Sequence, residues 1–266
     1  MASLPVASPM RDIPVRTITE HDLTQSLRDG YRDFLDKRGD LVFVGLLYPL
    51  IGFIAALAAL GGSILPLLFP MLAGLSLLGP LVSTGFYQLA KRREDGLESS
   101  WWHFFDVFKS PSREGILLVG IMLMVIFGAW LISAGITNAA FFGTKAPASV
   151  GMLLTEALTT PRGWAMILIG NAIGAVFAVI VLATSVVSLP LLIDKRIDAA
   201  TAVRTSLRAF NASRTLLLRW GLRVGILLVI GAVPVMLGLA FVLPVLGYAT
   251  WHLYTRLIDR SGLPGN

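Results

Sequence analysis

Residues 198–210 read DAATAVRTSLRAF, and this stretch sets a pattern that the chain repeats. It begins with Asp198, a residue type favoured at the N-cap of a helix. Val203, Leu207 and Phe210 then fall on one helical face, with arginines beside them. A hydrophobic stretch follows. A short amphipathic helix placed before such a stretch is expected to lie at the surface of a membrane.

Composition and run lengths predict the fold class. The chain has 266 residues, of which 55% are hydrophobic and 14% are charged, whereas a soluble domain carries about 25% charged residues. Long charge-free runs recur, and a run of about 20 residues can cross the roughly 30 Å hydrocarbon core as a helix. We therefore predict an all-α, polytopic membrane bundle. Cysteine is absent, which excludes disulfides and thiolate metal sites.

The hydrophobic runs predict six transmembrane helices. Their approximate ranges are 41–60, 64–90, 115–136, 163–193, 221–238 and 239–254. Pro80 predicts a kink in the second, because proline removes a backbone hydrogen bond. The fourth is too long for an untilted crossing, so it should tilt, kink near Pro190 or lie partly outside the bilayer. Two short helices meeting near Gly238 fit the last two ranges better than one long helix with an interfacial segment.

Two earlier stretches repeat the surface-helix pattern. In the first, Thr19 and Asp22 have the spacing of a capping box. The apolar stripe that follows consists of Leu23, Leu27, Tyr31 and Phe34. In the second, Asp95 and Glu98 have capping-box spacing. The stripe there consists of Leu97, Trp101, Phe104 and Phe108.

Each surface helix precedes two predicted spans, which divides the chain into three similar units. The units are residues 19–92, 95–196 and 198–260. Together they form one membrane domain, between a disordered tail (1–18) and a short C-terminal tail (261–266).

Two local matches favour a threefold repeat. Residues 80–92 align without gaps with residues 244–256, and the tripeptide Ser-Leu-Arg at 26–28 recurs at 206–208. The alternative is chance similarity, since low-complexity membrane sequences align with one another easily.

The positions of the basic residues predict the orientation. All Lys and Arg residues except Lys145 and Arg162 lie in the two tails or beside the three surface helices. The positive-inside rule then places both termini in the cytoplasm of a bacterial cell. Six spans are needed, since five would leave Arg256 and Arg260 outside. The net charge of +6 favours anionic lipid headgroups as partners. Nucleic acid is not expected, because acidic residues are interleaved with the basic ones.

The predicted spans contain few side chains that could bind an ion or react with a substrate. None carries Asp, Glu, Lys, Arg or His near its centre, and ion-coupled transporters usually need such a group. Asn171 is the least ordinary polar residue, and we expect an interhelical hydrogen bond there, with substrate or ion contact as the alternative. His21, His103 and His252 lie at or outside the predicted interfaces. We therefore expect no catalytic residues, no cofactor and no metal.

The most aromatic stretch lies in the second surface helix. Its residues, the candidate partner surface, are Trp101, Trp102, His103, Phe104 and Phe105, with Phe108 one turn on. His103 with Asp106 is the one local candidate for an acid–base pair. At the inner end of the last span, Trp251, His252 and Arg256 are expected to anchor the chain at the membrane interface.

Three segments carry a resemblance to a known family. They are SLR-x-G-Y-R-D-F (residues 26–34), SVVSLPLLIDK (185–195) and LPVLGYATWHLYTR (243–256). Over about residues 20–258 the chain resembles an uncharacterised bacterial family of predicted integral membrane proteins with a domain of unknown function. Its members are often labelled as similar to cytochrome c oxidase subunit I. The resemblance implies an inner-membrane location and transfers no functional residues. The missing intramembrane histidines exclude the catalytic subunit.

These patterns lead to one functional expectation and one alternative. We expect a non-catalytic inner-membrane protein that acts as an accessory subunit or assembly factor of a larger complex, and the family label suggests a respiratory one. The alternative is a transporter or lipid-handling protein for an apolar or zwitterionic substrate. A polar cavity around Asn171 would favour that alternative.

Overall fold

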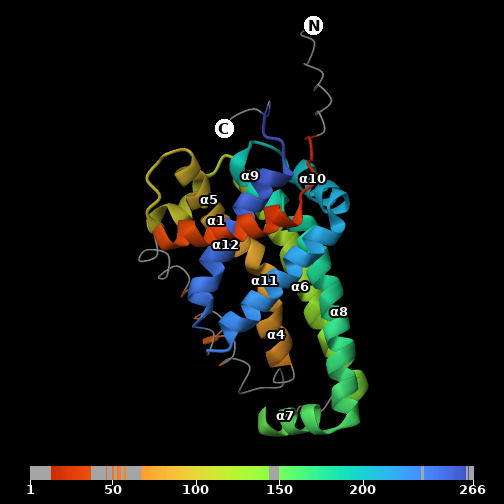
Figure 1. Cartoon of the computed structure of the whole chain (residues 1–266). Coiled ribbons are helices and arrows are strands. Elements are labelled where there is room, and N and C mark those ends of the chain that lie inside the picture. Colours follow the sequence, from red (N-terminus) through yellow and green to blue (C-terminus); the bar gives the residue numbers. More distant parts are fainter. Residues whose placement is uncertain are drawn as a thin grey trace.

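The computed structural model describes residues 13–36, 67–143, 150–234, 237–261 and 263, with isolated residues between 46 and 57. The elements in these ranges are helices (Figure 1). An isolated antiparallel bridge joins Val15 to Ile258. The all-α prediction is therefore confirmed. The predicted first span falls almost entirely outside the described residues.

Four helical segments are long and apolar enough to cross a membrane. They are Phe69–Glu94, Arg113–Phe142, Pro161–Asp194 and Arg214–Ala232, and they correspond to the second to fifth predicted spans. The last of them is helix α11 (Arg214–Ala232). Helix α12 (Leu239–Leu257) has Gly238 at its N-cap and occupies the sixth predicted position, although it is not among the four. The multi-pass prediction and the break near Gly238 are confirmed.

Proline interrupts two of these segments. Helix α4 (Leu68–Leu75) passes through a 3₁₀ turn, η2 (Ser76–Leu78), into α5 (Gly79–Glu94). Pro80 lies in the first turn of α5, where a missing N–H breaks no helical bond. Likewise α8 (Pro161–Ser185) stops before a separate short helix, α9 (Ser188–Asp194), which contains Pro190. Both predicted kinks are present, as breaks between helices.

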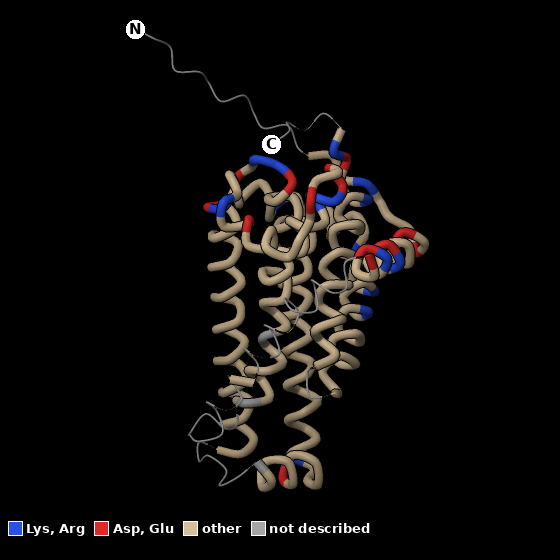
Figure 2. The backbone as a smooth tube through the Cα atoms, turned by 90° about the vertical axis from the view of Figure 1, so that its left-hand side faces the viewer, with Lys and Arg blue, Asp and Glu red and all other residues tan. Residues whose placement is uncertain are grey.

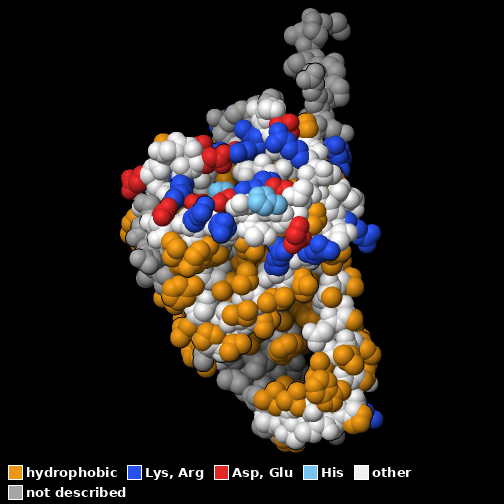
Figure 3. Space-filling model, in the orientation of Figure 1, with side chains coloured by type: hydrophobic (Ala, Val, Ile, Leu, Met, Phe, Trp, Pro, Cys, Tyr) orange, Lys and Arg blue, Asp and Glu red, His pale blue; other side chains and the backbone are white. Residues whose placement is uncertain are grey.

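Charge and apolar surface are segregated along the molecule. Helices α6 (Arg113–Phe142) and α8 run from the charged end to α7 (Val150–Thr159) at the opposite end (Figure 1). Charged residues gather at one end, and few lie near α7 (Figure 2). Below this charged band the surface is largely apolar (Figure 3). Exposed Leu, Ile and Val side chains on α6, α8 and α11 make up much of it, as expected for surface that contacts lipid.

Two of the three surface helices begin as expected. At α1 (Glu20–Asp36), the Thr19 amide donates to Asp22 Oδ2 (2.7 Å) and the Asp22 amide donates to Thr19 Oγ1 (3.4 Å), which is a capping box. At α10 (Ala199–Ala212), the Asp198 carboxylate accepts from the Thr201 amide (2.9 Å). The capping box predicted at Asp95 is wrong, because that residue ends α5 and a loop follows it.

The buried face of α1 differs from the predicted stripe. Ser26 and Gly30 are buried along with Leu23 and Phe34, whereas Tyr31 remains 52% exposed. A Cβ on Gly30 would lie 2.7 Å from the Cα of Ala249 in α12, so α1 packs backbone to backbone on that helix. The small residues therefore direct half of the stripe into protein rather than towards lipid.

Each predicted surface helix packs on the helix that ends a predicted repeat unit. Helix α1 packs on α12, α10 packs on α9, and the middle element, η3 (Trp101–Lys109), packs on α5. The serines of the two Ser-Leu-Arg tripeptides are both buried. Ser26 Oγ accepts from Arg256 (3.0 Å), and Ser206 Oγ donates to the carbonyl of Ala183 (2.8 Å).

Candidate functional site

The aromatic stretch forms a 3₁₀ helix with three distinct faces. This helix, η3, has about three residues per turn, so every third side chain shares a face. The inner face consists of Trp101, Phe104 and Val107, the polar face of His103, Asp106 and Lys109, and the outer face of Trp102, Phe105 and Phe108. The predicted α-helical stripe is therefore wrong at Phe108, which faces outward, and at Leu97, which lies before η3 and is 54% exposed.

The inner face of η3 is fixed on α5 by a glycine. The ring of Phe104 fills the space that a Cβ on Gly85 would occupy. The same ring packs edge-on against Phe86, with centroids 5.0 Å apart, and Val107 is buried beside it. This packing orients the other two faces of η3.

The polar face forms a closed network around His103. Arg92 donates to His103 Nε2 (3.3 Å), so the ring proton lies on Nδ1, which donates to Asp106 Oδ2 (2.6 Å). Lys109 donates to the other oxygen of Asp106 (3.2 Å). The hydrogen bond from His103 lowers the pKa of Asp106. The candidate pair of His103 and Asp106 is thus in contact, but both ring nitrogens are engaged, and neither is open to a substrate.

The outer face of η3 exposes three large aromatic side chains in one row. Trp102 is 65% exposed, Phe105 40% and Phe108 73%. The indole of Trp102 stacks on Trp101, with ring centroids 3.6 Å apart. Stacking and the inner-face packing hold this row, the aromatic stripe, in a defined position. A rigid apolar row at the charged end of the molecule is the strongest candidate for a contact surface.

The three expected interface anchors have partners inside the protein. Trp251 is buried, and its Nε1 donates to Glu94 (3.0 Å). His252 Nε2 donates to Asp33 (2.7 Å), and Arg256 donates to Asp29 (2.7 Å). These bonds fasten α12 to α5 and α1. Sequence position alone could not distinguish an arginine facing lipid headgroups from one facing an aspartate on a neighbouring helix.

A further buried cluster surrounds Asp194 and was not anticipated. Tyr254 donates its hydroxyl to Asp194 Oδ2 (2.8 Å), and Arg260 lies 3.7 Å from the same oxygen. Lys91 donates to the backbone carbonyls of Ile193 (3.2 Å) and Asp194 (3.1 Å). The ends of α5, α9 and α12 are thereby joined. An acidic residue directly after the apolar run SLPLLI was the available signal, since a buried charge needs a partner.

Asn171 does not lie at a helix interface. Its side chain is on the exposed side of α8, and Nδ2 donates to the Ile167 carbonyl of the same helix (2.8 Å). The structure therefore shows an intrahelical bond where an interhelical one was expected. Within the described ranges, no three His, Asp or Glu side chains are arranged to hold a metal ion.

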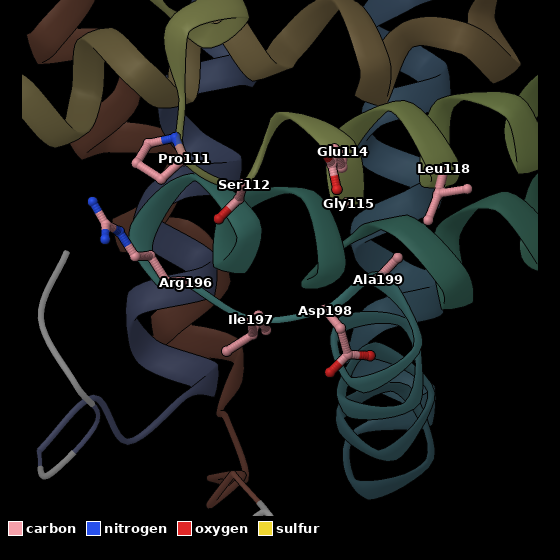
Figure 4. A pocket seen from close by; sticks show the side chains of 9 residues that line it. All are labelled: Pro111, Ser112, Glu114, Gly115, Leu118, Arg196, Ile197, Asp198 and Ala199. Atoms are coloured by element: carbon pink, nitrogen blue, oxygen red, sulfur yellow. The ribbon is translucent and has the colours of Figure 1, made fainter.

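A groove of about 440 Å³ lies where α6 begins and the α9–α10 link passes (Figure 4). Glu114, Arg196 and Asp198 border it, but their side chains point in different directions (Figure 4). Asp198 is already used as the α10 cap, and the hydrogen bond from the Thr201 amide lowers its pKa. The groove therefore lacks a convergent set of polar groups and is a weaker candidate than η3.

Comparison with known proteins identifies a family for the middle of the chain. Residues 68–194 match the model of the family described as "Predicted integral membrane protein (DUF2189)". The resemblance to an integral membrane family of unknown function is thus confirmed over this range, which contains SVVSLPLLID but neither of the other two segments. No curated protein and no solved structure matches the chain.

Proposed function

We propose that this integral membrane protein acts through contacts, as an accessory subunit or assembly factor of a larger complex in the bacterial inner membrane. The aromatic stripe on η3 is the observation that carries the proposal. Three exposed rings in a fixed row would bury a large apolar area at little cost in side-chain entropy. A partner membrane protein that covers Trp102, Phe105 and Phe108 would remove this area from water.

The proposed arrangement in the membrane follows from the segregation of charge. Lys and Arg residues gather at one end of the backbone (Figure 2), whereas Arg162 lies at the start of α8, directly after α7. With the charged end in the cytoplasm, the protein obeys the positive-inside rule. Both termini are then cytoplasmic, and anionic headgroups lie against the charged band. Six helices enter the bilayer, of which α11 and α12 need not cross it completely.

The packing of the surface helices supports the proposed threefold repeat. Arg92 and Arg256 occupy equivalent places in the aligned segments 80–92 and 244–256. Arg92 donates to η3 through His103 (3.3 Å), and Arg256 donates to α1 through Asp29 (2.7 Å). In both cases, the arginine that ends one unit binds the surface helix of another. This shared role of the two arginines favours the repeat over chance alignment for these two segments.

Co-purification and site-specific crosslinking test the proposed partner contact. A photoreactive residue at position 102 or 108 should form an adduct with a discrete membrane protein. That protein should co-migrate with the chain on native gels in mild detergent. Replacing Trp102 and Phe108 with Gln should abolish the co-migration, because the apolar contact is lost while the packing of Phe104 on Phe86 is kept.

Replacement of Trp164 and Phe241 by Gln provides the matched control. Both side chains are more than half exposed, but they lie on α8 and α12 away from η3. Their replacement should leave the complex intact. A chain that migrates alone, or crosslinks from position 108 that recover only lipid, would contradict the proposal. The transporter alternative gains no support from Asn171, since its amide is bonded within α8.

A further inference from the structure

One face of α11 combines two arginines with a continuous apolar lane. Arg219 and Arg223 are one turn apart near the start of the helix. Both contact the carboxylate of Glu20 in α1, Arg219 at 3.3 Å and Arg223 in a closer ion pair. Two guanidinium groups share one carboxylate, so the cluster keeps a net charge of +1.

The apolar lane begins within the same turns of α11. Its side chains are at least half exposed, and they are Leu222, Ile226, Val229, Ile230 and Val233. Spacings of three and four residues place them on the helix face that carries the arginines. The lane therefore runs from the charged band into the apolar surface, whose boundary is visible in Figure 3.

Such a face matches the chemistry of a phospholipid. Arginine binds phosphate oxygens through a planar fork of donors, and an exposed apolar lane one turn deeper would lie against an acyl chain. We propose that this face of α11 binds an anionic phospholipid, with the phosphate between Arg219 and Arg223 and an acyl chain along the lane. The inference rests on the proposed membrane-surface role of the charged end and is independent of the partner at η3.

Glu20 makes the proposal sharply testable. Its carboxylate occupies the place that a phosphate would take, so it competes with the lipid. Replacing Glu20 with Gln removes the competitor and should strengthen lipid binding. Replacing Arg219 and Arg223 with Gln should weaken binding by about fivefold or more, given the contribution of each arginine near an anionic surface. Both changes break the same contact between α1 and α11, so a purely structural role predicts the same effect for both.

The test measures binding of palmitoyl-oleoyl-phosphatidylglycerol to the purified full chain by native mass spectrometry, with the phosphatidylcholine analogue for comparison. Because no partner protein is present, this result is separate from the co-purification result. A variant with Arg113 and Arg196 replaced by Gln is the charge control. It also removes two positive charges from the charged end, and in the described ranges neither residue forms an ion pair. This control should bind within about twofold of the unmodified chain.

Three results would overturn the proposal. If the Arg113 and Arg196 control weakened lipid binding equally, net charge alone would explain the weaker binding. If Glu20→Gln weakened lipid binding, the role of the cluster would be to hold α1 against α11 and not to bind lipid. Binding of inorganic phosphate as tight as that of phosphatidylglycerol would show that no acyl chain takes part in the site. If the glutamine variant of Arg219 and Arg223 does not fold, Arg219→Lys with Arg223→Lys replaces it. That variant keeps both charges but lacks the planar fork of donors, so it should bind more weakly than the unmodified chain.

Discussion

Asp106 is the residue on which the polar face of η3 converges. It accepts from His103 and Lys109, and Arg92 lies 3.8 Å away. The carboxylate thus joins the two ends of η3 to the last turns of α5. Its partners are cations and a ring N–H, so the charged form of the carboxyl is the one that the fold needs.

We expect Asp106→Asn to destabilise the protein by about 1–2 kcal/mol at pH 7, because the amide lacks the negative charge and has one acceptor oxygen where the carboxylate has two. The pKa of Asp106 is lowered in the folded state by the hydrogen bond from His103. The stabilisation is therefore present above the unfolded value of about 3.9 and is lost as pH falls through the folded value. Thermal unfolding in detergent from pH 7 to 3 measures this.

Asp95→Asn provides the control for this prediction. Asp95 lies on the same side of the molecule, and its side chain makes no hydrogen bond or ion pair in the described part of the chain. Its replacement should change the unfolding temperature little at any pH. A constant difference between Asp106→Asn and the unmodified chain down to pH 3 would contradict the role given to the carboxylate.

At the scale of the elements, Gly30 decides how α1 docks. The helix approaches α12 so closely that a Cβ on Gly30 would meet backbone atoms of Ala249, with the Cα at 2.7 Å. Backbone cannot rotate away, so Gly30→Ala should destabilise the protein by about 1–3 kcal/mol. Thermal unfolding and protease cleavage near α1 report this change.

Gly128→Ala in α6 is the control, because a Cβ there meets nothing within 4 Å, and the substitution should be neutral or slightly stabilising. Equal effects of the two substitutions would rule out the close contact.

The positions at which helices begin and break could be predicted from the local sequence. The number of residues per turn could not always be predicted in this way. Breaks at Pro80 and Pro190 were predictable because proline acts on its own backbone. The caps at Thr19 and Asp198 were predictable for the same reason. The 3₁₀ form of η3 was not, because its three faces depend on Gly85 of α5 admitting the Phe104 ring. An α-helical period applied to residues 97–108 therefore assigned Phe108 to the wrong face.

At the scale of the whole molecule, the distribution of charged residues can be predicted from the sequence, because the bilayer excludes charge from its centre. Hydrophobic runs and basic residues sort along one direction, so four of the spans and the charged end could be predicted. Which residues pair across helices could not be predicted. Arg256 next to Asp29, and Asp194 next to Tyr254, bring together residues 60 or more positions apart. Their contact depends on tertiary packing, which hydropathy does not encode.

The turn between α11 and α12 is the part of the molecule that decides how deeply these two helices enter the bilayer. Arg223 is the last charged residue of α11, and the nine residues after it rise only about 14 Å, less than half of the hydrocarbon core. The connecting sequence, VPVMLG at 233–238, has no polar side chain, and Val233 is 77% exposed. The described ends of α11 and α12 also lie nearer the charged end than α7 does (Figure 1). We infer that this hairpin enters and leaves from the same side.

Single cysteines can measure that depth without background, because the chain has none of its own. Glu156→Cys in α7 should react with a membrane-impermeant maleimide added to the outside of spheroplasts. Asn211→Cys at the charged end should react only after permeabilisation. Val233→Cys should react poorly in both conditions, because a re-entrant turn remains within the hydrocarbon. Labelling of Val233→Cys from outside as fast as that of Glu156→Cys would show instead that α11 crosses completely. Both outcomes keep the C-terminus on the side of α1, so the experiment separates two topologies that the distribution of charges treats as equal.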